Sequence, residues 1–195
     1  MISDAIKLIR LNLKSYILEF EPDLELGEAV LVQNIAMAEE LGGTNNQLTG
    51  HVVMSLVNVQ EEATLKNGSA YQTSNGRAIY KNPPVHINLF ILFSVLHNQY
   101  ETSLQLLSRV IEFFQWKKEL SFVTAPVSGI SGNISREITI RPDLYSLTFE
   151  QLNHLWGALG GKQVPFVMYR MRVIAIEAEK QKAEGEVINQ IYINE

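Results

Sequence analysis

The amino-acid sequence predicts an α+β fold, in which a mixed, mainly antiparallel sheet packs with three helices. Residues 85–96 form a dense run of apolar, β-branched and aromatic side chains after Pro83 and Pro84. Such a run is typical of a strand buried on both faces at the centre of a sheet. Strand-like segments also follow one another in places instead of alternating with helices, which favours an α+β layer over a doubly wound parallel sheet.

Two segments show the apolar spacing of amphipathic helices. In both, apolar residues alternate spacings of four and three, which places them on one side of a helix. The predicted buried positions are Ile2, Ile6, Ile9, Leu13, Tyr16 and Phe20 in the first segment, and Tyr100, Leu104, Leu107, Ile111 and Phe114 in the second. Pro22 is expected to end the first helix.

A third helix is predicted from its two ends. Thr148 and Gln151 have the spacing of a capping box, so the helix is expected to begin after Thr148. Gly160 and Gly161 can adopt the left-handed conformation that ends a helix. Between these ends, the helix runs through the apolar residues Phe149, Leu152, Leu155 and Trp156.

Five segments are predicted to be strands, namely residues 29–37, 51–60, 85–96, 134–141 and 166–176. Between the second and third strands, residues 61–82 are polar, rich in Asn, Ser, Gly and Thr, and without a strong period. This stretch exceeds the usual length of a loop, so we expect either a functional arm or a mobile tip. Residues 117–133 are also predicted to be a loop, because they contain Pro126, Gly129 and Gly132.

The length of 195 residues favours one domain. We expect a main domain over residues 1–176 and a C-terminal arm over residues 177–195. The arm begins with an excess of Glu over Lys and ends in the β-prone segment 187–193. Because such a segment can add a strand to a neighbouring sheet, Ile188, Ile191 and Tyr192 are candidate contacts with a partner.

Two further sites are candidate contacts. Arg170 and Arg172 lie two residues apart and therefore on one face of the last strand. They either form a solvated sheet face or pair with acidic residues of a neighbouring subunit. Trp116, at the end of the second helix, is a candidate contact anchor.

The composition argues against several classes of function. Hydrophobic residues make up 46% of the chain and charged residues 19%, which fits a globular protein and not a disordered one. The net charge of −5 gives no support to nucleic acid or a membrane surface as the partner. The absence of cysteine excludes disulfides and thiol catalysis. The N-terminus lacks the pattern of a signal peptide, so we expect synthesis and assembly in the cytoplasm.

The sequence contains no motif for catalysis, for a cofactor or for a metal, and we expect that the protein is not an enzyme. Residues 157–162 superficially resemble a phosphate loop, but a helix precedes the glycines, whereas a phosphate cradle needs the helix to follow them. The four histidines are dispersed, without metal-ligand spacing. The alternative is a small-molecule-binding or hydrolytic site around His86, Asn88 and His154, which would require a well-formed apolar pocket.

Three blocks of the sequence resemble a known family. They are residues 83–89 with the strand that follows, the helical segment 100–114, and residues 155–161. Together they are similar to the cap, or tail-terminator, proteins of extracellular contractile injection systems, the family that contains the Pvc16-type N-terminal domain. The resemblance extends over about residues 1–176.

This resemblance implies the fold of phage tail terminators and a structural role. A hexameric ring would sit on the distal end of the inner tube, stop its growth and anchor the last sheath layer. The implied partners are further copies of the chain, the inner tube protein, the sheath protein and a second cap protein. The implied final location is the assembled particle, inside the cell or released from it. A baseplate or collar adaptor of the same particle is the alternative role.

Overall fold

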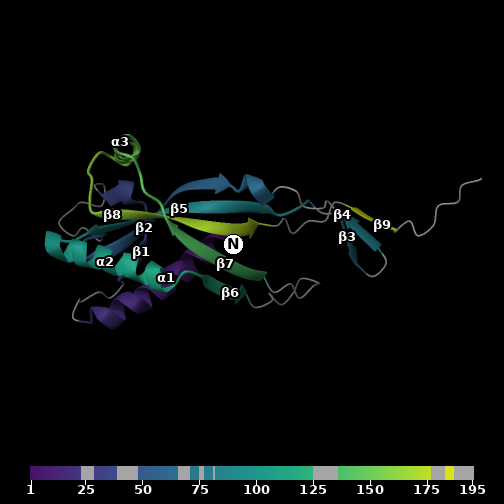
Figure 1. Ribbon diagram of the computed structural model, residues 1–195, viewed down its shortest axis with the longest axis horizontal. Helices are drawn as coiled ribbons and strands as arrows, with labels where there is room; N and C mark the ends of the chain where they lie inside the picture. Colours follow the sequence, from purple (N-terminus) through teal and green to yellow (C-terminus); the bar gives the residue numbers. More distant parts are fainter. Residues whose placement is uncertain are drawn as a thin grey trace, which may run out of the picture. The chain divides into compact units, whose positions relative to one another are not determined.

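The computed structural model describes residues 1–22, 29–38, 48–65, 71–74, 77–80, 82–124, 136–176 and 183–186. The chain divides into two units, one made of Met1–Gln60 with Asn88–Ile174 and the other of Glu61–Ile87 with Ala175–Glu195. The α-helices and most of a six-stranded sheet lie in the first unit, and a three-stranded sheet lies in the second (Figure 1).

Within these ranges the chain forms three α-helices, two short 3₁₀ helices and nine strands. The helices are α1 (Ile2–Phe20), η1 (Ile35–Ala38), η2 (Ala63–Leu65), α2 (Tyr100–Trp116) and α3 (Phe149–Ala158). The strands are β1 (Val30–Val32), β2 (His51–Glu61), β3 (Tyr71–Ser74), β4 (Arg77–Tyr80), β5 (Val85–Leu96), β6 (Leu120–Thr124), β7 (Arg136–Leu144), β8 (Phe166–Ile176) and β9 (Ala183–Glu186).

The larger sheet has the strand order β1-β2-β5-β8-β7-β6. β1 runs parallel to β2, whereas β7 runs antiparallel to both of its neighbours, β6 and β8. The smaller sheet has the order β3-β4-β9, and both of its pairings are antiparallel. The predicted fold class, a mixed and mainly antiparallel sheet with three helices, is therefore confirmed.

Strand β5 lies in the middle of the larger sheet and is its most buried part. Every residue from Ile87 to Val95 is buried, and strands flank β5 on both sides. The bounds of β5 are those predicted from its apolar run. Because successive side chains of a strand point to opposite faces, β5 supplies core residues to both layers of the domain.

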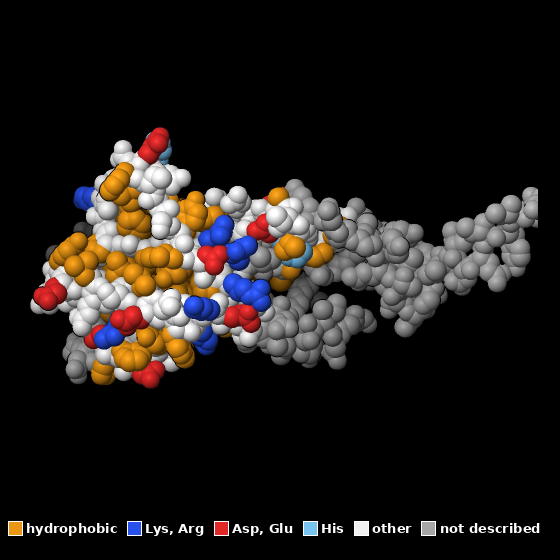
Figure 2. Space-filling model, viewed as in Figure 1, with side chains coloured by type: hydrophobic (Ala, Val, Ile, Leu, Met, Phe, Trp, Pro, Cys, Tyr) orange, Lys and Arg blue, Asp and Glu red, His pale blue; other side chains and the backbone are white. Residues whose placement is uncertain are grey.

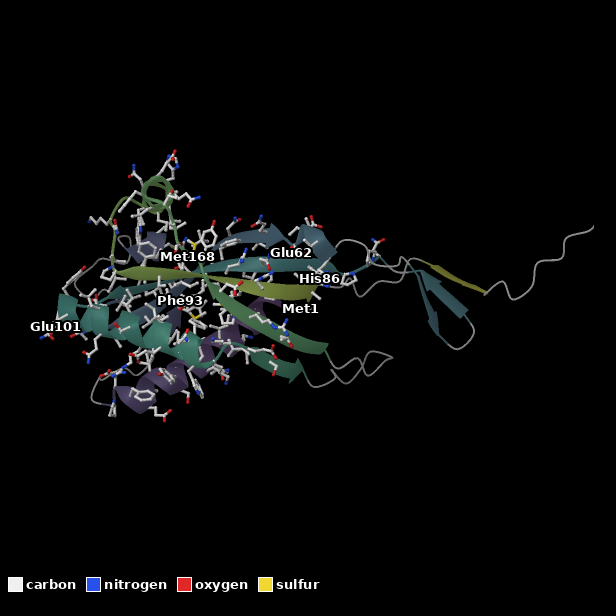
Figure 3. The ribbon with its side chains drawn as sticks, viewed as in Figure 1. Met1, Glu62, His86, Phe93, Glu101 and Met168 are labelled. Carbon is white, nitrogen blue, oxygen red and sulfur yellow. The ribbon has the colours of Figure 1, made fainter. Side chains whose placement is uncertain are left out.

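The two faces of β5 pack against different helices. On one face, the Phe93 ring lies 5.2 Å from Phe114 of α2 and 6.0 Å from Tyr169 of β8, measured between ring centroids. On the other face, Phe90 and Leu92 belong to a cluster with Trp156 of α3. Figure 3 shows Phe93 within the body formed by this sheet and its helices, and Figure 1 shows α1 and α2 on one side and α3 on the other.

The predicted ends of α1 and α3 are confirmed. α1 stops at Phe20, two residues before Pro22. At the start of α3, the Gln151 N–H donates to the Thr148 hydroxyl at 3.3 Å, and the Thr148 N–H donates to the Gln151 side-chain oxygen at 3.1 Å. Gly160, just beyond the end of α3, has φ +105°, a conformation that favours glycine. None of the described helices is long and apolar enough to cross a membrane.

The predicted buried face of α2 is wrong for most of its positions. The buried side chains are Ser103, Leu106, Val110, Phe113 and Phe114, whereas Tyr100, Leu104 and Ile111 are exposed. The helix carries two overlapping apolar stripes, and packing against the sheet selects the one that contains both phenylalanines. In α1 the prediction holds better. Ile9 and Leu13 are buried, as predicted, and Phe20 is the exposed exception at the end of the helix. Phe149 is also exposed, at the first turn of α3.

Four strands were not predicted. β3 and β4 lie in the polar stretch 61–82, β6 lies in the predicted loop 117–133, and β9 lies in the C-terminal segment. These strands are only four or five residues long and pair through their main chains, so their side-chain pattern gives little signal.

The first predicted strand is also shorter than expected. β1 ends at Val32 and the 3₁₀ helix η1 follows it. The Ser55 hydroxyl donates to the Gln33 carbonyl at 2.6 Å and accepts from the Ile35 N–H at 3.0 Å. This buried hydroxyl therefore replaces the main-chain partners that a longer strand would have used.

Candidate interaction surfaces

Two neighbouring strands bring charged side chains onto one face of the larger sheet. β7 and β8 pair with Arg141 opposite Arg172 and Asp143 opposite Arg170. The Asp143 carboxylate accepts hydrogen bonds from Arg170 at 3.3 Å and from Arg172 at 3.2 Å, and Arg141 donates to Glu119 at 2.9 Å. Arg170 and Arg172 therefore share one face, as their spacing predicted. We call Arg141, Asp143, Arg170 and Arg172 the arginine cluster.

The arginine cluster carries more positive than negative charge. Its three guanidinium groups pair with the carboxylates of Asp143 and Glu119, which leaves one positive charge in excess among these described side chains. Arg141, Asp143 and Arg172 line a hollow of about 380 Å³, and among the described residues no acceptor bonds the buried Nε of Arg170. Figure 2 shows Lys and Arg side chains gathered on this face. The cluster is thus suited to bind a carboxylate of a partner.

A second surface lies at the end of α2, where the Trp116 side chain is exposed. Its ring stacks on Tyr16 of α1, with 5.8 Å between centroids and 22° between planes. The Lys117 ammonium lies 5.7 Å from the Trp116 ring and donates to the Asn12 side chain at 2.7 Å. These contacts hold the exposed indole in place, so that a partner can bury it at little cost in side-chain entropy.

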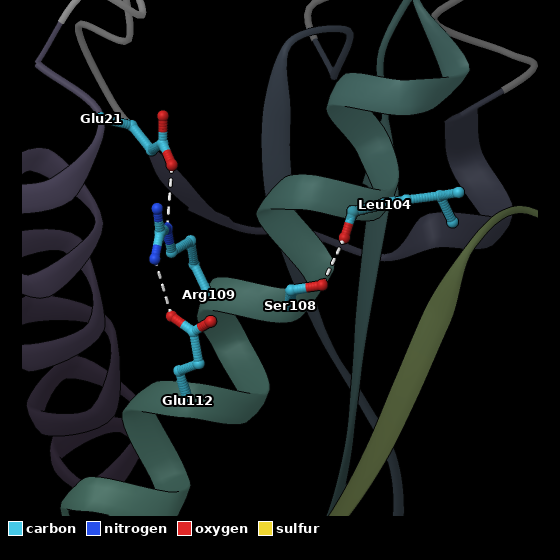
Figure 4. A network of polar contacts seen from close by, with 5 residues as sticks. All are labelled: Glu21, Leu104, Ser108, Arg109 and Glu112. Carbon is cyan, nitrogen blue, oxygen red and sulfur yellow. Dashed lines mark hydrogen bonds and ion pairs between the residues drawn. The ribbon is translucent and has the colours of Figure 1, made fainter.

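An ion-pair network joins α1 to α2 (Figure 4). The Arg109 side chain donates to Glu21 just after α1 and to Glu112 on α2, both at 2.8 Å. Its guanidinium carbon also lies 5.3 Å from the centroid of the Phe20 ring. Hydrogen bonds from the guanidinium to Glu21 and then to Glu112 raise the pKa of Arg109 above its ordinary value. The network fixes the helix pair that carries Trp116.

A third surface is the exposed apolar stripe of α2. Tyr100, Leu104 and Ile111 occupy the face that the sequence predicted to be buried, and all three side chains are exposed. In Figure 2, hydrophobic side chains gather over α2. Three exposed large side chains on one side of a helix are more than the scattered apolar residues of an ordinary surface.

A fourth surface is the open outer edge of β2, which the sequence analysis missed. β1 pairs only with Val52, Val53 and Met54, and among the described residues no strand continues that pairing. We call residues 56–60 the β2 edge. A hollow of about 560 Å³ lies beside it, and its lining residues are Ile6, Val32, Gln33, Asn34, Met54, Leu56, Val57, Leu155, Ala158 and Leu159.

Comparison with known proteins assigns the sequence to a family. The family model of the Pvc16 N-terminal domain matches residues 5–190, which is nearly the whole chain. The chain belongs to the Pvc16 N-terminal domain family. No curated protein matches it.

Two solved structures share the fold of this Pvc16 N-terminal domain. The sheath/tube terminator of an extracellular contractile injection system, PVC, in the extended state, is 14% identical with a TM-score of 0.65, and the match covers 100% of this chain and 62% of that one. The tube-terminating cap of the anti-feeding prophage is 12% identical with a TM-score of 0.60, and the match covers 98% of this chain and 60% of that one. This chain therefore spans about three fifths of the length of either protein.

The remaining candidate residues of this Pvc16 N-terminal domain fall into two groups. Ile188, Ile191 and Tyr192 lie outside the described residues. His86 is half-buried and Asn88 is buried, both in β5, whereas His154 is exposed on α3. None of the three lines either of the two hollows described above. Within the described ranges, no three His, Asp or Glu side chains converge in a way that could hold a metal ion.

Proposed function

We propose that this chain is a structural, non-enzymatic cap that ends the tube and sheath of a phage-tail-like contractile injection particle. In this proposal, residues 1–176 form the capping domain and residues 177–195 form a contact arm. A hexameric ring stops growth of the inner tube and anchors the last sheath layer. The chain is made and assembled in the cytoplasm and ends in the assembled particle.

The observation that carries this proposal is the family match over residues 5–190, together with the shared fold. Two solved proteins with that fold are described as a sheath/tube terminator and as a tube-terminating cap. The surfaces of this chain add support, because the arginine cluster, Trp116 and the β2 edge are suited to contacts with other proteins.

The proposed contacts differ in chemistry. Arg170 and Arg172 pair with acidic residues of a neighbouring subunit, Trp116 is buried as an anchor, and Ile188, Ile191 and Tyr192 add main-chain hydrogen bonds and apolar area. A closed ring with cyclic symmetry requires head-to-tail contacts, in which two different surfaces of each subunit meet. The inner tube protein, the sheath protein and a second cap protein are the other proposed partners.

Electron microscopy of particles from cells that lack this chain tests the proposal. We expect tubes of irregular length, or sheaths that contract or detach early. Particles of normal length with an intact distal end would refute the cap function. Particles that fail at the opposite end would identify a baseplate or collar adaptor instead.

A charge reversal tests the proposed role of the arginine cluster. We expect Arg172→Glu to reduce incorporation of the chain into particles, because the carboxylate repels the acidic partner and Asp143. Lys7→Glu, which reverses the charge of an exposed side chain on α1, is the matched control and is expected to be incorporated normally. Equal incorporation of both variants would show that the arginine cluster is not part of the interface.

A further inference from the structure

Within the part of the chain that the structure describes, no strand pairs with the outer side of the β2 edge, so its main-chain groups can accept an extended chain. On the outer side of β2, the Val52 N–H donates to the Ala29 carbonyl at 3.0 Å, and the Met54 carbonyl accepts from the Gln33 N–H at 3.1 Å. Because main-chain groups of alternate residues point to the same side of a strand, those of Leu56 and Asn58 continue this row beyond β1. The chemistry that matches such a row is another extended main chain.

Apolar side chains from both faces of the sheet surround this edge. The hollow is lined by Ile6 of α1 and by Leu155 and Leu159 of α3, and these two helices lie on opposite faces. Leu56 and Val57, which also line the hollow, point to opposite faces themselves. A strand that fills this place therefore has apolar surroundings on both sides. Such a strand must be apolar on both sides, as β5 is.

The chain itself contains a segment that is mostly apolar on both sides. Residues 187–193 have the sequence Val-Ile-Asn-Gln-Ile-Tyr-Ile, without charge, proline or glycine. In an extended conformation, Ile188 and Tyr192 would point to one side with Gln190 between them, and Val187, Ile191 and Ile193 would point to the other side with Asn189. At about 3.3 Å per residue, seven extended residues span roughly 23 Å, which exceeds the roughly 17 Å of the five-residue edge.

We propose that the β2 edge binds residues 187–193 of a second copy of this chain as an added strand. The inference rests on the proposed ring, in which head-to-tail contacts require a donor and an acceptor on different parts of each subunit. The β2 edge is the acceptor and the C-terminal segment is the donor. Main-chain hydrogen bonds supply affinity, and the hollow selects the apolar side chains.

Disulfide trapping tests this proposal directly, since the native chain contains no cysteine. Full-length chains carrying Asn58→Cys are mixed with full-length chains carrying Asn189→Cys or Gln190→Cys, and the mixture is oxidised. A disulfide between the two variants can form only between copies. Leu11→Cys on α1, which is also exposed, replaces Asn58→Cys in the control mixture. We expect a mixed disulfide well above the control, identified by mass spectrometry of the linked peptides.

Three outcomes decide the proposal. An excess of the mixed disulfide over the Leu11→Cys control supports it. Equal yields in both mixtures overturn it. A disulfide that forms only within single chains of the double variant Asn58→Cys/Asn189→Cys also overturns it, because the segment then binds its own copy.

A second variant tests the hollow itself. Leu56, on the β2 edge, and Leu11, on α1, are both exposed. We expect Leu56→Lys to abolish the mixed disulfide, because it places a charge in the apolar hollow, and Leu11→Lys to leave it unchanged. Both variants are compared by circular dichroism to confirm that they fold. This readout uses the purified chain alone, so its failure is distinct from a failure of the cap function, which is read from particle ends.

Discussion

The two faces of the larger sheet differ in how completely helices cover them. α1 and α2, of 19 and 17 residues, cover one face, and there Phe93 and Phe113 are fully buried. α3, of 10 residues, covers the other face and buries one side chain of its own, Trp156. The short helix leaves Val59, in the outer half of β2, exposed.

This difference indicates that one face mainly stabilises the domain and that the other is suited to binding. The face under α1 and α2 holds the domain together, because a layer of two helices removes its apolar side chains from water. The face under α3 is only partly covered. Beside it lies the outer edge of β2, where the described residues leave a hollow that is lined by Ile6 of α1 and by Leu155 and Leu159 of α3. Four substitutions test this division, in order of the effect that we expect.

The largest effect is expected from Phe93→Ala on the well-covered face. Phe93 is fully buried against Phe114 and Tyr169, so the substitution should lower the free energy of unfolding by about 3–5 kcal/mol. Denaturant unfolding followed by circular dichroism measures this loss. Ile111→Ala on the exposed stripe of α2 is the control, with an expected change within about 0.5 kcal/mol. A similar loss for both variants would break the distinction between the buried and exposed stripes.

A smaller loss is expected from Trp156→Ala on the α3 face. Trp156 is buried, but in the described part of the chain its indole N–H has no hydrogen-bond partner. Removing an unsatisfied donor offsets part of the lost packing, so we expect a loss of about 2–3 kcal/mol in the same unfolding experiment. A loss larger than that of Phe93→Ala would reverse the ranking of the two faces.

A local effect is expected from Thr148→Ala at the start of α3. The substitution removes the hydroxyl that accepts from the Gln151 N–H and should lower stability by about 1 kcal/mol. Since α3 is the one described α-helix on its face (Figure 1), the loss should appear as faster amide hydrogen exchange within Phe149–Ala158. Uniformly faster exchange, with α1 and α2 affected equally, would show that α3 does not open independently.

The smallest effect at neutral pH is expected from Tyr169→Phe. Burial raises the pKa of Tyr169 above its ordinary value of 10.0. The folded state therefore disfavours the ionised phenol. Below about pH 10 the phenol is protonated in both states and its ionisation does not change the free energy of unfolding. Above about pH 10 the unfolded state loses the proton more readily, so the free energy of unfolding falls as the pH rises toward the folded pKa. We expect the stabilities of the two proteins to differ by a constant amount up to about pH 10 and wild type to lose more above it. Parallel curves above about pH 10 would contradict the desolvation of the Tyr169 phenol in the folded state.

The elements that could be predicted from sequence are those whose signals are local. The run 85–96 and the strand 166–176 have the predicted bounds, and the capping box of Thr148 forms as its spacing indicates. Each of these signals depends on residues that are close in the chain and on main-chain chemistry. The positive φ of Gly160 and Gly161 is predictable for the same reason.

The features that could not be predicted depend on partners far away in the chain. The buried stripe of α2 is chosen by the sheet beneath it, because the helix itself has two apolar stripes. Asp143 contacts Arg170 only because the register of β7 on β8 brings together residues 27 positions apart. The β2 edge is open because β1 is short, and η1 begins where a longer strand would have continued. The residue pattern of β2 alone therefore does not predict that its outer edge lacks a neighbouring strand among the described residues.

The arginine cluster has a consequence for how salt should affect the rate of association. The whole chain carries a net charge of −5, whereas the cluster is locally positive. Two copies therefore repel at long range and attract only where the cluster meets a carboxylate. The Debye length falls from about 30 Å at 0.01 M salt to about 10 Å at 0.1 M. Modest salt thus screens the distant repulsion first, and higher salt screens the close attraction. The rate at which copies associate into the proposed ring is expected to pass through a maximum as ionic strength increases.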